Sequence, residues 1–439
     1  MSGPRSVSSR TAIRRPLNVR RAVALAAASV TGRLPGFLIP VLVAAVFGAA
    51  GQTDAYFVVY NAVLLVGGTL AQAVDVSIVP FAARRLLMAG GNPSHFLSRT
   101  SGRVLLVALA AWLVIVPTLL LASAGLGRAV GLYGLSFMPL VLCWSWASVY
   151  SGALVAQGRI AHATTSLGLR GLGGLLGLAL APAGGGLWAV ALGLGAGELA
   201  RALWLRHSLF AAHELVTTGA EFTPTGSFRR ALAPLVVAGA AVTGVPVLEK
   251  LFALSLGPGA ASHLEYATRV LVIPAVLFDG AIAPHFLSTW SQLRATDGRP
   301  PSRREIGAAL GTALMAAAPL AVLLAVMAPQ VIALLLHHGR FSDSDASAVV
   351  LLLRLMALGF TGGMCALVVE RAYLASERNT LLAFLSTTRA AIRLLMIALL
   401  LRAWGIRAFP LAYAAGEWAY LLLLWTFLPN HAETPGAGR

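Results

Sequence analysis

Charged side chains inside long apolar runs are the residues of this sequence best suited to chemistry. Two aspartates, Asp75 in DVSIVP and Asp279 in DGAIAP, share the pattern Asp-x-x-Ile-x-Pro, 204 positions apart. A proline lacks the backbone N–H, so the carbonyl four residues earlier, just after each aspartate, loses its helical partner. An aspartate beside such a carbonyl is suited to hold a cation or a proton. One hypothesis from the repeated pattern is therefore an ion- or proton-coupling site in each half of the chain.

Two further roles are open to these aspartates. Each acid can neutralise an arginine that also stands in an apolar run, such as Arg33 or Arg269, or the pattern can be a coincidence. An ionised side chain at the centre of a membrane costs about 2.5–3.5 kcal/mol on insertion scales, so such groups face a partner or a wet cavity. The sequence alone does not decide among the three.

Further charged residues in apolar runs predict either an anion site or structural ion pairs. Glu265 lies four residues before Arg269, so the two share one face of a helix and can pair. Either the pair is structural, or Arg269 anchors an anion and the carboxylate of Glu265 tunes that arginine. Glu249 and Lys250 are adjacent and point about 100° apart on a helix, so they do not pair directly. Lys250 is a candidate to face a cavity.

Other charged and glycine-rich stretches predict packing. Glu370, Arg371, Arg389 and Arg393 are expected to form ion pairs between helices. The run LGLRGLGGLLGLAL (167–180) is rich in small residues, which let helices approach closely in a membrane. It lacks the preceding strand that a phosphate-binding loop needs, so close helix packing is the expectation.

The composition defines the elements that must position these residues. The chain has 439 residues, of which 58% are hydrophobic and only 11% charged, with a mean hydropathy of +0.80. Soluble proteins carry about 25% charged residues, so an integral membrane protein is predicted. The net charge of +17 fits basic cytoplasmic loops rather than nucleic-acid binding. The two cysteines, Cys143 and Cys365, have neither disulfide nor metal spacing.

Polar breaks divide the chain into about twelve helical spans. The predicted spans are 20–48, 54–88, 100–124, 131–156, 160–181, 186–208, 230–255, 262–293, 305–336, 345–375, 380–402 and 405–428. A bilayer core of about 30 Å needs about 20 residues of helix, which each range supplies. Arginines concentrate in alternate loops, so both termini are predicted to be cytoplasmic.

An internal repeat relates the two halves. VAQGRIAHATTSLGLR (155–170) matches LASERNTLLAFLSTTR (374–389) at an offset of 219, which pairs Arg170 with Arg389. Six spans per half give both halves the same orientation, so the repeat is parallel, with its axis along the membrane normal. The predicted parts are a basic tail (1–19), an N-lobe (20–208), a linker (209–229), a C-lobe (230–428) and a second tail (429–439).

Several motifs, in order along the chain, carry a family resemblance. They are FGAAGQTDAYFVVYN (47–61), LEKLFALSLGPGAASHLEYATRVLVIPAVLF (248–278), HHGRFSDSDA (337–346) and ERAYLASERNT (370–380). The chain resembles the MurJ/MviN family of lipid II flippases, in the multidrug, oligosaccharidyl-lipid and polysaccharide exporter superfamily. The resemblance implies an all-α fold of two six-helix lobes around a V-shaped central cavity. It also implies movement of a polyprenyl-pyrophosphate-linked sugar, held by cationic side chains.

The resemblance extends unevenly to single residues. Arg33 in RLPGF and Arg269 in YATR match arginines of the family, and Asp54 matches its Thr-Asp. Ile39 and Asn61 stand where the family has two further arginines. The substrate-binding candidates are Arg33, Arg269, Lys250, Asn61 and Asp54, and the candidates for a coupling-ion or charge-partner role are Asp75, Asp279, Glu265 and Glu249.

The sequence therefore favours a flippase for an undecaprenyl-pyrophosphate-linked cell-wall or polysaccharide precursor, working by alternating access. An ion-coupled exporter of cationic small molecules and a non-transporting scaffold for envelope synthesis are the alternatives. No catalytic triad, nucleotide-binding lysine or metal-ligand spacing is present in the sequence, so neither an enzyme nor a cofactor is expected. The expected partners are a lipid-linked glycan, membrane lipids and cell-wall synthesis enzymes, without nucleic acid. The expected location is the bacterial cytoplasmic membrane.

Overall fold

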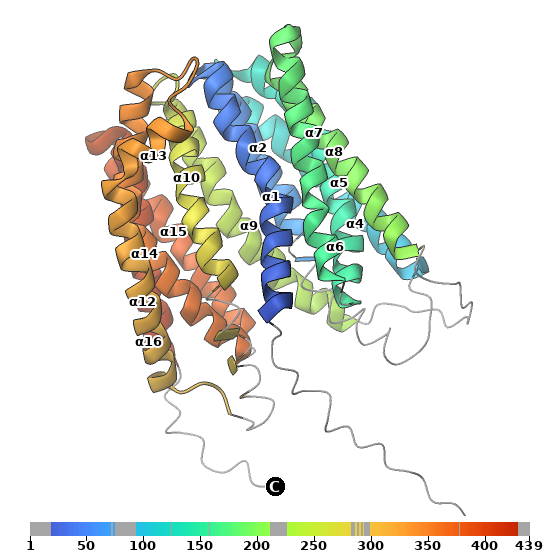
Figure 1. Cartoon of the computed structure of the whole chain (residues 1–439), viewed down its shortest axis with the longest axis vertical. Coiled ribbons are helices and arrows are strands. Elements are labelled where there is room, and N and C mark those ends of the chain that lie inside the picture. The colour runs from blue at the N-terminus through green and yellow to red at the C-terminus, as the bar shows by residue number, and fades with distance from the viewer. Residues whose placement is uncertain are drawn as a thin grey trace, which may run out of the picture.

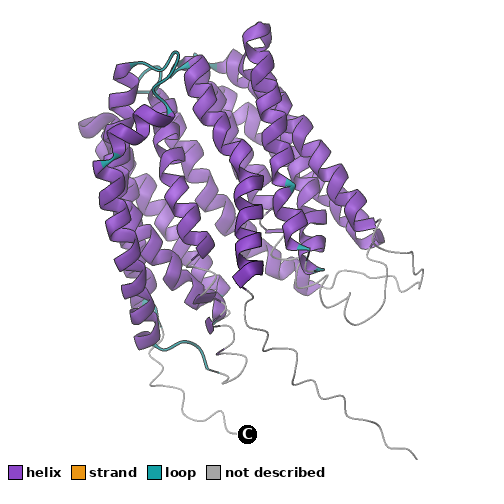
Figure 2. Cartoon of the chain, viewed as in Figure 1, coloured by secondary structure: helices purple, strands orange, loops and turns teal. Residues whose placement is uncertain are grey.

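The described part of the structure consists of helices and the loops that join them. It is a computed structural model that describes residues 19–71, 73–74, 94–123, 125–157, 159–210, 226–281, 286–287, 289–290, 293, 299–376 and 378–428. Figure 2 shows helices joined by short loops, and no strand occurs within these ranges. The predicted all-α fold is confirmed.

The helices of the N-terminal half follow the predicted spans closely. They are α1 (Val19–Phe47), α2 (Gly51–Val63) with its π-helical continuation η1 (Leu64–Gly68), α4 (Ser94–Ala122), α5 (Gly127–Ala156), α6 (Ile160–Thr165), α7 (Leu167–Leu180), η2 (Ala181–Gly185) and α8 (Gly186–Phe210). Pro35 and Pro40 stay inside α1, and Pro139 stays inside α5. Prolines are tolerated in membrane helices where neighbouring groups satisfy the freed carbonyl.

The C-terminal half is built in the same way. Its elements are α9 (Gly226–Leu254), α10 (Ala260–Ala281), α12 (Arg303–Val326), α13 (Ala328–Leu335), α14 (Asp343–Ala375), α15 (Asn379–Trp404), η3 (Gly405–Arg407) and α16 (Ala408–Thr426). Seven helical segments within the described ranges are long and apolar enough to cross a membrane. Together with the composition, they make this a multi-pass membrane protein.

The helices form two groups that meet along a few central elements. In one group α7 packs on α1 and α8, and α5 packs on α4 and α8. In the other, α14 packs on α10, α12 and α16, and α15 packs on α9 and α16. Figure 1 shows α1 between the two groups, beside α7 on one side and α10 on the other. Contacts between the groups run from α2 and η1 to α9, and from α1 and α2 to α10.

Glycines bring α1 and α7 into backbone contact. A Cβ atom added to Gly171 on α7 would lie 2.6 Å from the backbone nitrogen of Gly36 on α1, and one added to Gly32 on α1 would clash with the carbonyl oxygen of Thr164 on α6. Real Cβ atoms do not approach that closely, so only glycine permits this spacing. The packing role predicted for the glycine-rich run is confirmed, and it places the arginines beside these glycines, Arg33 and Arg170, next to each other.

Candidate functional site

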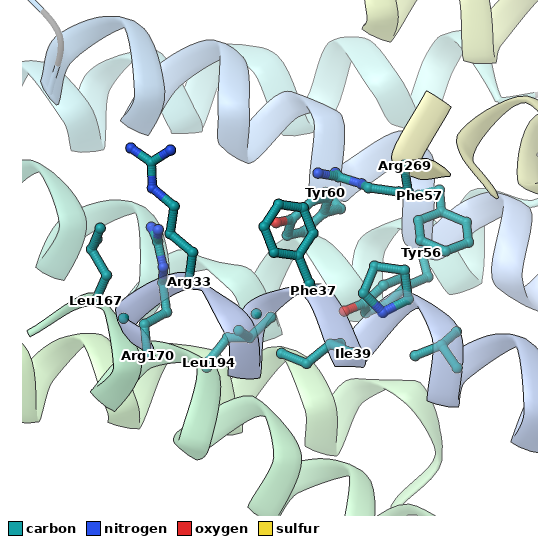
Figure 3. Close-up of a pocket in the computed structure, with 15 residues that line it drawn as sticks. Arg33, Phe37, Ile39, Tyr56, Phe57, Tyr60, Leu167, Arg170, Leu194 and Arg269 are labelled. Atoms are coloured by element: carbon teal, nitrogen blue, oxygen red, sulfur yellow. The ribbon is translucent and has the colours of Figure 1, made fainter. Parts of the chain in front are cut away.

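A cavity of about 340 Å³ lies where α1, α2, α7, α8 and α10 meet. Its lining residues are Gly32, Arg33, Gly36, Phe37, Ile39, Pro40, Val43, Tyr56, Phe57, Tyr60, Leu167, Arg170, Gly171, Leu194 and Arg269. Three of these are arginines, and none of the described lining residues is acidic. Figure 3 shows Arg33 and Arg170 beside each other at one end, with Arg269 next to Tyr60 at the other. The described lining therefore favours an anion.

Arg33 is the most exposed of the three arginines. It stands on α1 and no described residue forms an ion pair or hydrogen bond with its side chain. Its neighbour Gly32 packs on the backbone at Thr164, so the α1 backbone stays fixed while the guanidinium extends into the cavity. A guanidinium with unused donors is suited to bind phosphate oxygens in a bidentate manner.

Arg170 is held from two sides without being fully paired. Its guanidinium lies 4.4 Å from the ring centre of Trp144 on α5, a cation–π contact. Its Nε lies 3.5 Å from Oε2 of Glu198 on α8, an ion pair without a hydrogen bond to that oxygen. The other oxygen of Glu198 accepts a hydrogen bond from Arg201, which also donates to Ser166. Glu198 is completely buried, so its main neutralising partner is Arg201.

Arg269 is tied to Glu265, the residue four positions earlier on α10. Its Nε donates a hydrogen bond to Oε1 of Glu265 at 2.7 Å, and its Nη2 lies 2.6 Å from the same oxygen. Its guanidinium also lies 5.1 Å from the ring centre of Tyr60 on α2. The predicted pairing within one helix face is thus observed, and Arg269 still lines the cavity.

Glu265 links three helices. Its Oε2 accepts a hydrogen bond from Asn61 on α2 at 2.9 Å and lies 3.3 Å from Nζ of Lys250 on α9. Glu265 and Lys250 are only 1% and 2% exposed, so this is a buried ion pair that needs its hydrogen bonds. Lys250 reaches Glu265 and is not among the residues that line the cavity.

The hydrogen bond between Asn61 and Glu265 joins the two halves of the chain, because α2 belongs to one half and α10 to the other.

Asp54 joins the two groups of helices at one end of the molecule. Its carboxylate accepts hydrogen bonds from the backbone N–H of Gly259 at 2.6 Å and of Ser262 at 2.7 Å. These groups open α10, so a residue of α2 caps a helix of the other half. Tyr266 donates to the carbonyl of Gly48 nearby, at 3.0 Å. This end, which carries the turn between α1 and α2 at the top of Figure 1, is closed by direct contacts.

The ion pairs predicted for Arg389 and Arg393 are present, and Glu370 accepts a hydrogen bond from Tyr420 at 2.8 Å. Arg393 on α15 forks onto Glu249 on α9, with distances of 2.6 and 2.9 Å. Arg389 lies 3.3 Å from Glu417 on α16 and 4.4 Å from the ring centre of Tyr420. Glu249 therefore has a structural partner outside the cavity lining.

The repeated aspartates are only partly covered by the structure. Asp75 lies outside the described residues, and Asp279 belongs to the last turn of α10. Their coupling role stays a prediction. Among the three arginines of the described cavity lining, Arg170 is the one that sequence reasoning did not select. Its signal was present, because the internal repeat aligns Arg170 with Arg389, but the glycine-rich surroundings favoured a packing role.

Comparison with solved structures places the fold among helical membrane transporters. A chain described as "Lipid II flippase MurJ, inward closed conformation" matches with a TM-score of 0.78 and 18% identity, over 92% of this chain and 86% of that one. An inward-facing MATE family transporter of the MOP superfamily matches with a TM-score of 0.69 and 13% identity, over 92% of this chain and 97% of that one. At these identities the likeness concerns the fold.

The sequence comparison identifies the family. A model described as "Lipid II flippase MurJ" matches residues 43–438, and the chain belongs to that family. A "Probable lipid II flippase MurJ" from Bdellovibrio bacteriovorus is 23% identical over 181 residues. This alignment covers 41% of the chain and 35% of the relative's length.

Proposed function

We propose that this chain translocates a lipid-linked glycan precursor that carries a pyrophosphate, such as lipid II. The observation that carries the proposal is the cavity between the two halves, whose described lining holds three arginines and no carboxylate. Guanidinium groups bind phosphate oxygens through charge-assisted hydrogen bonds. Arg33 and Arg269 hold the pyrophosphate, and family membership supplies the substrate class.

The charged groups behind the cavity support its polarity. Lys250 and Arg269 together carry two positive charges, which Glu265 offsets by one. Asn61 adds a neutral hydrogen bond from the other half. The cluster thus keeps a positive charge next to the cavity, although the family arginines at Ile39 and Asn61 are absent. Lys250 and Asn61 act on the substrate through Glu265 and Arg269.

Alternating access requires the contacts at Asp54 to break and reform. The hydrogen bonds from Gly259 and Ser262 to Asp54 join α2 to α10 and close one end of the cavity. Their opening lets the N-lobe (20–208) and the C-lobe (230–428) separate at that end, with residues 209–229 as the linker. Asp54 is therefore a gate residue in this proposal rather than a direct ligand of the substrate.

The membrane placement follows the positive-inside rule. The protein lies in the bacterial cytoplasmic membrane, with the tails 1–19 and 429–439 in the cytoplasm. The substrate then enters from the cytoplasmic side, where such precursors are completed, and leaves on the far side. Cell-wall synthesis enzymes that use the product are the expected partners.

The two alternatives predict different behaviour. An exporter of cationic molecules has a structural relative in the MATE fold, but the arginine-lined cavity of this chain repels a cation. It would instead bind its substrate at Asp75 and Asp279. A scaffold would tolerate neutral replacements of all the cavity arginines.

Complementation tests the proposal directly. The chain is expressed in cells depleted of their essential lipid II flippase, alongside Arg269→Ala and Arg354→Ala. Arg354 is a matched control, because it is an exposed arginine on α14 that donates to the carbonyl of Ala325 outside the cavity. Wild type and Arg354→Ala are expected to restore growth, and Arg269→Ala is expected to lose it.

Contrary growth results would redirect the proposal. Growth restored equally by Arg269→Ala would contradict the role of this arginine and favour a scaffold. Absence of rescue by protein that is shown to be folded in the membrane would exclude lipid II itself. Another lipid-linked glycan, or a cation held at Asp75 and Asp279, would then be tested.

A further inference from the structure

We infer that Arg170 is a phosphate-binding residue, which forms with Arg33 a two-arginine clamp on the N-terminal side of the cavity. The inference rests on the proposed function. In it, Arg170 supplies a positive charge in place of the family arginines that are missing at Ile39 and Asn61. Arg170, Arg33 and Ile39 all line the same cavity, so the replacement keeps the positive charge near the lost position.

The backbone geometry brings the two arginines together. Arg33 follows Gly32, which packs on the backbone of α6 at Thr164, and Arg170 precedes Gly171, which packs on the backbone of α1 at Gly36. Because these contacts are between backbones, neither arginine side chain is needed to hold the helices together. Both guanidinium groups are left to extend into the cavity, as Figure 3 shows. Two adjacent guanidinium groups repel each other unless an anion lies between them.

Glu198 is arranged to release Arg170. Its Oε1 is held by Arg201, while its Oε2 is 3.5 Å from Arg170 and accepts no hydrogen bond from the described residues. When Arg170 turns toward a phosphate, Glu198 keeps Arg201 as its neutralising partner. The buried carboxylate is therefore never left alone, so the movement of Arg170 avoids the penalty of an unpaired buried charge.

Trp144 fixes the direction in which Arg170 turns. The indole lies against Gly67 on η1, where an added Cβ atom would be 3.0 Å from its Cε3. The ring is thus wedged in place and supports one face of the guanidinium, 4.4 Å away. The edge of the guanidinium, which carries the hydrogen-bond donors, stays free to bind an anion in the cavity.

The C-terminal half supplies a matched control. Arg389 and Glu417 occupy the positions equivalent to Arg170 and Glu198, 219 residues further on, and their atoms are 3.3 Å apart. Arg389 does not line the cavity. A merely structural Arg–Glu pair predicts the same behaviour for both arginines, whereas a phosphate clamp predicts a difference.

The test is a binding measurement on purified protein in detergent. The probe is undecaprenyl pyrophosphate, and its Kd is measured for wild type, Arg33→Gln, Arg170→Gln, Arg170→Lys and Arg389→Gln. We expect Arg33→Gln and Arg170→Gln each to weaken binding by about tenfold or more, which is typical of a lost charge-assisted hydrogen bond. Arg170→Lys should retain part of the affinity, and Arg389→Gln should bind like wild type.

A double variant tests whether the two arginines share one ligand. The losses from Arg33→Gln and Arg170→Gln should not simply add in the combined variant, because both side chains contact the same pyrophosphate. Inorganic pyrophosphate as a second probe should show the same order of variants. That agreement would place the recognition on the phosphates rather than on the lipid tail.

The contrary results separate the two proposals. If Arg33→Gln weakens binding and Arg170→Gln does not, the clamp is wrong while the proposed function stands. Equal losses for Arg170→Gln and Arg389→Gln would also overturn the clamp, because they would indicate a shared structural role. If wild-type protein fails to bind the probe, the pyrophosphate-linked substrate class falls, and the clamp with it. Gel filtration identifies any variant that fails to fold. If Arg170→Gln fails to fold, Arg170→Lys tests the clamp instead, because it keeps the positive charge beside Glu198.

Discussion

The Arg–Glu pair between α7 and α8 and the pair between α15 and α16 are the same element of the repeat in two different settings. Arg170 and Glu198 approach to 3.5 Å, and Arg389 and Glu417 approach to 3.3 Å. Each arginine also lies 4.4 Å from the centre of an aromatic ring, Trp144 in one half and Tyr420 in the other. The internal repeat has preserved the pair, although its surroundings have diverged.

One difference between the two settings lies three residues after each glutamate. Arg201 in the N-terminal half corresponds, at the offset of 219, to Tyr420 in the C-terminal half. Glu198 therefore has two arginines around it, while Glu417 has Arg389 and an aromatic neighbour. Arg201 adds a second cation to the pair in the N-terminal half, and Tyr420 adds none to the pair in the C-terminal half. At this repeated pair, the additional positive charge therefore lies in the N-terminal half, on the side of the cavity that Arg170 lines.

Replacing the glutamate of each pair should give the largest effect, and it tests directly whether the two pairs differ. Glu198→Gln leaves Arg170 and Arg201 without their buried anion, so we expect a loss of about 3–5 kcal/mol in the free energy of unfolding. Glu417→Gln should cost less, because Glu370 still acts electrostatically on Arg389. Apparent Tm values in one detergent, measured by intrinsic fluorescence, compare the two variants. A decrease in Tm as large in Glu417→Gln as in Glu198→Gln would show that Arg201 does not make the two pairs differ in stability.

Removing the second arginine should give a medium effect and sharpen the comparison. Arg201→Gln removes the second cation beside Glu198, and Glu198 then depends on Arg170 alone. Arg170 should be drawn away from the cavity, and the Kd for undecaprenyl pyrophosphate should rise by about tenfold. Titration of the purified variant measures this change. An unchanged Kd would mean that Glu198 does not compete with the ligand for Arg170.

Removing the aromatic support should give the smallest effect. Trp144→Leu deletes the cation–π contact with Arg170 and should weaken binding of the same lipid by about two- to fivefold. Tyr420→Phe keeps a ring beside Arg389 in the other half and should leave the Kd unchanged. The same titration serves both variants. A loss of affinity in Tyr420→Phe as large as in Trp144→Leu would indicate a general packing effect.

The fold was predictable because membrane helices are specified by long apolar runs. Each of the predicted spans overlaps a helix of the described structure, and prolines such as Pro139 and Pro274 did not interrupt the helices that contain them. The pair formed by Glu265 and Arg269 was also predictable, because both residues lie on one helix with a spacing of four.

The site was predictable only where its contacts are local or resemble the family. The hydrogen bond between Asn61 and Glu265 joins two helices from different halves, and no spacing within one helix indicates it. The role of Asp54 as a cap on α10 was missed for the same reason. Arg170 was obscured by the glycines around it, although those glycines are what bring it next to Arg33.

The contacts of Glu265 have a consequence for how the two halves can separate. Its ion pairs with Lys250 and Arg269 lie within the C-terminal half, whereas its hydrogen bond from Asn61 comes from the N-terminal half. A movement that parts α2 from α10 at this point breaks a hydrogen bond from a neutral amide and leaves both ion pairs intact. The buried carboxylate therefore keeps its cations while the halves move, so the seam between them opens without exposing an unpaired charge.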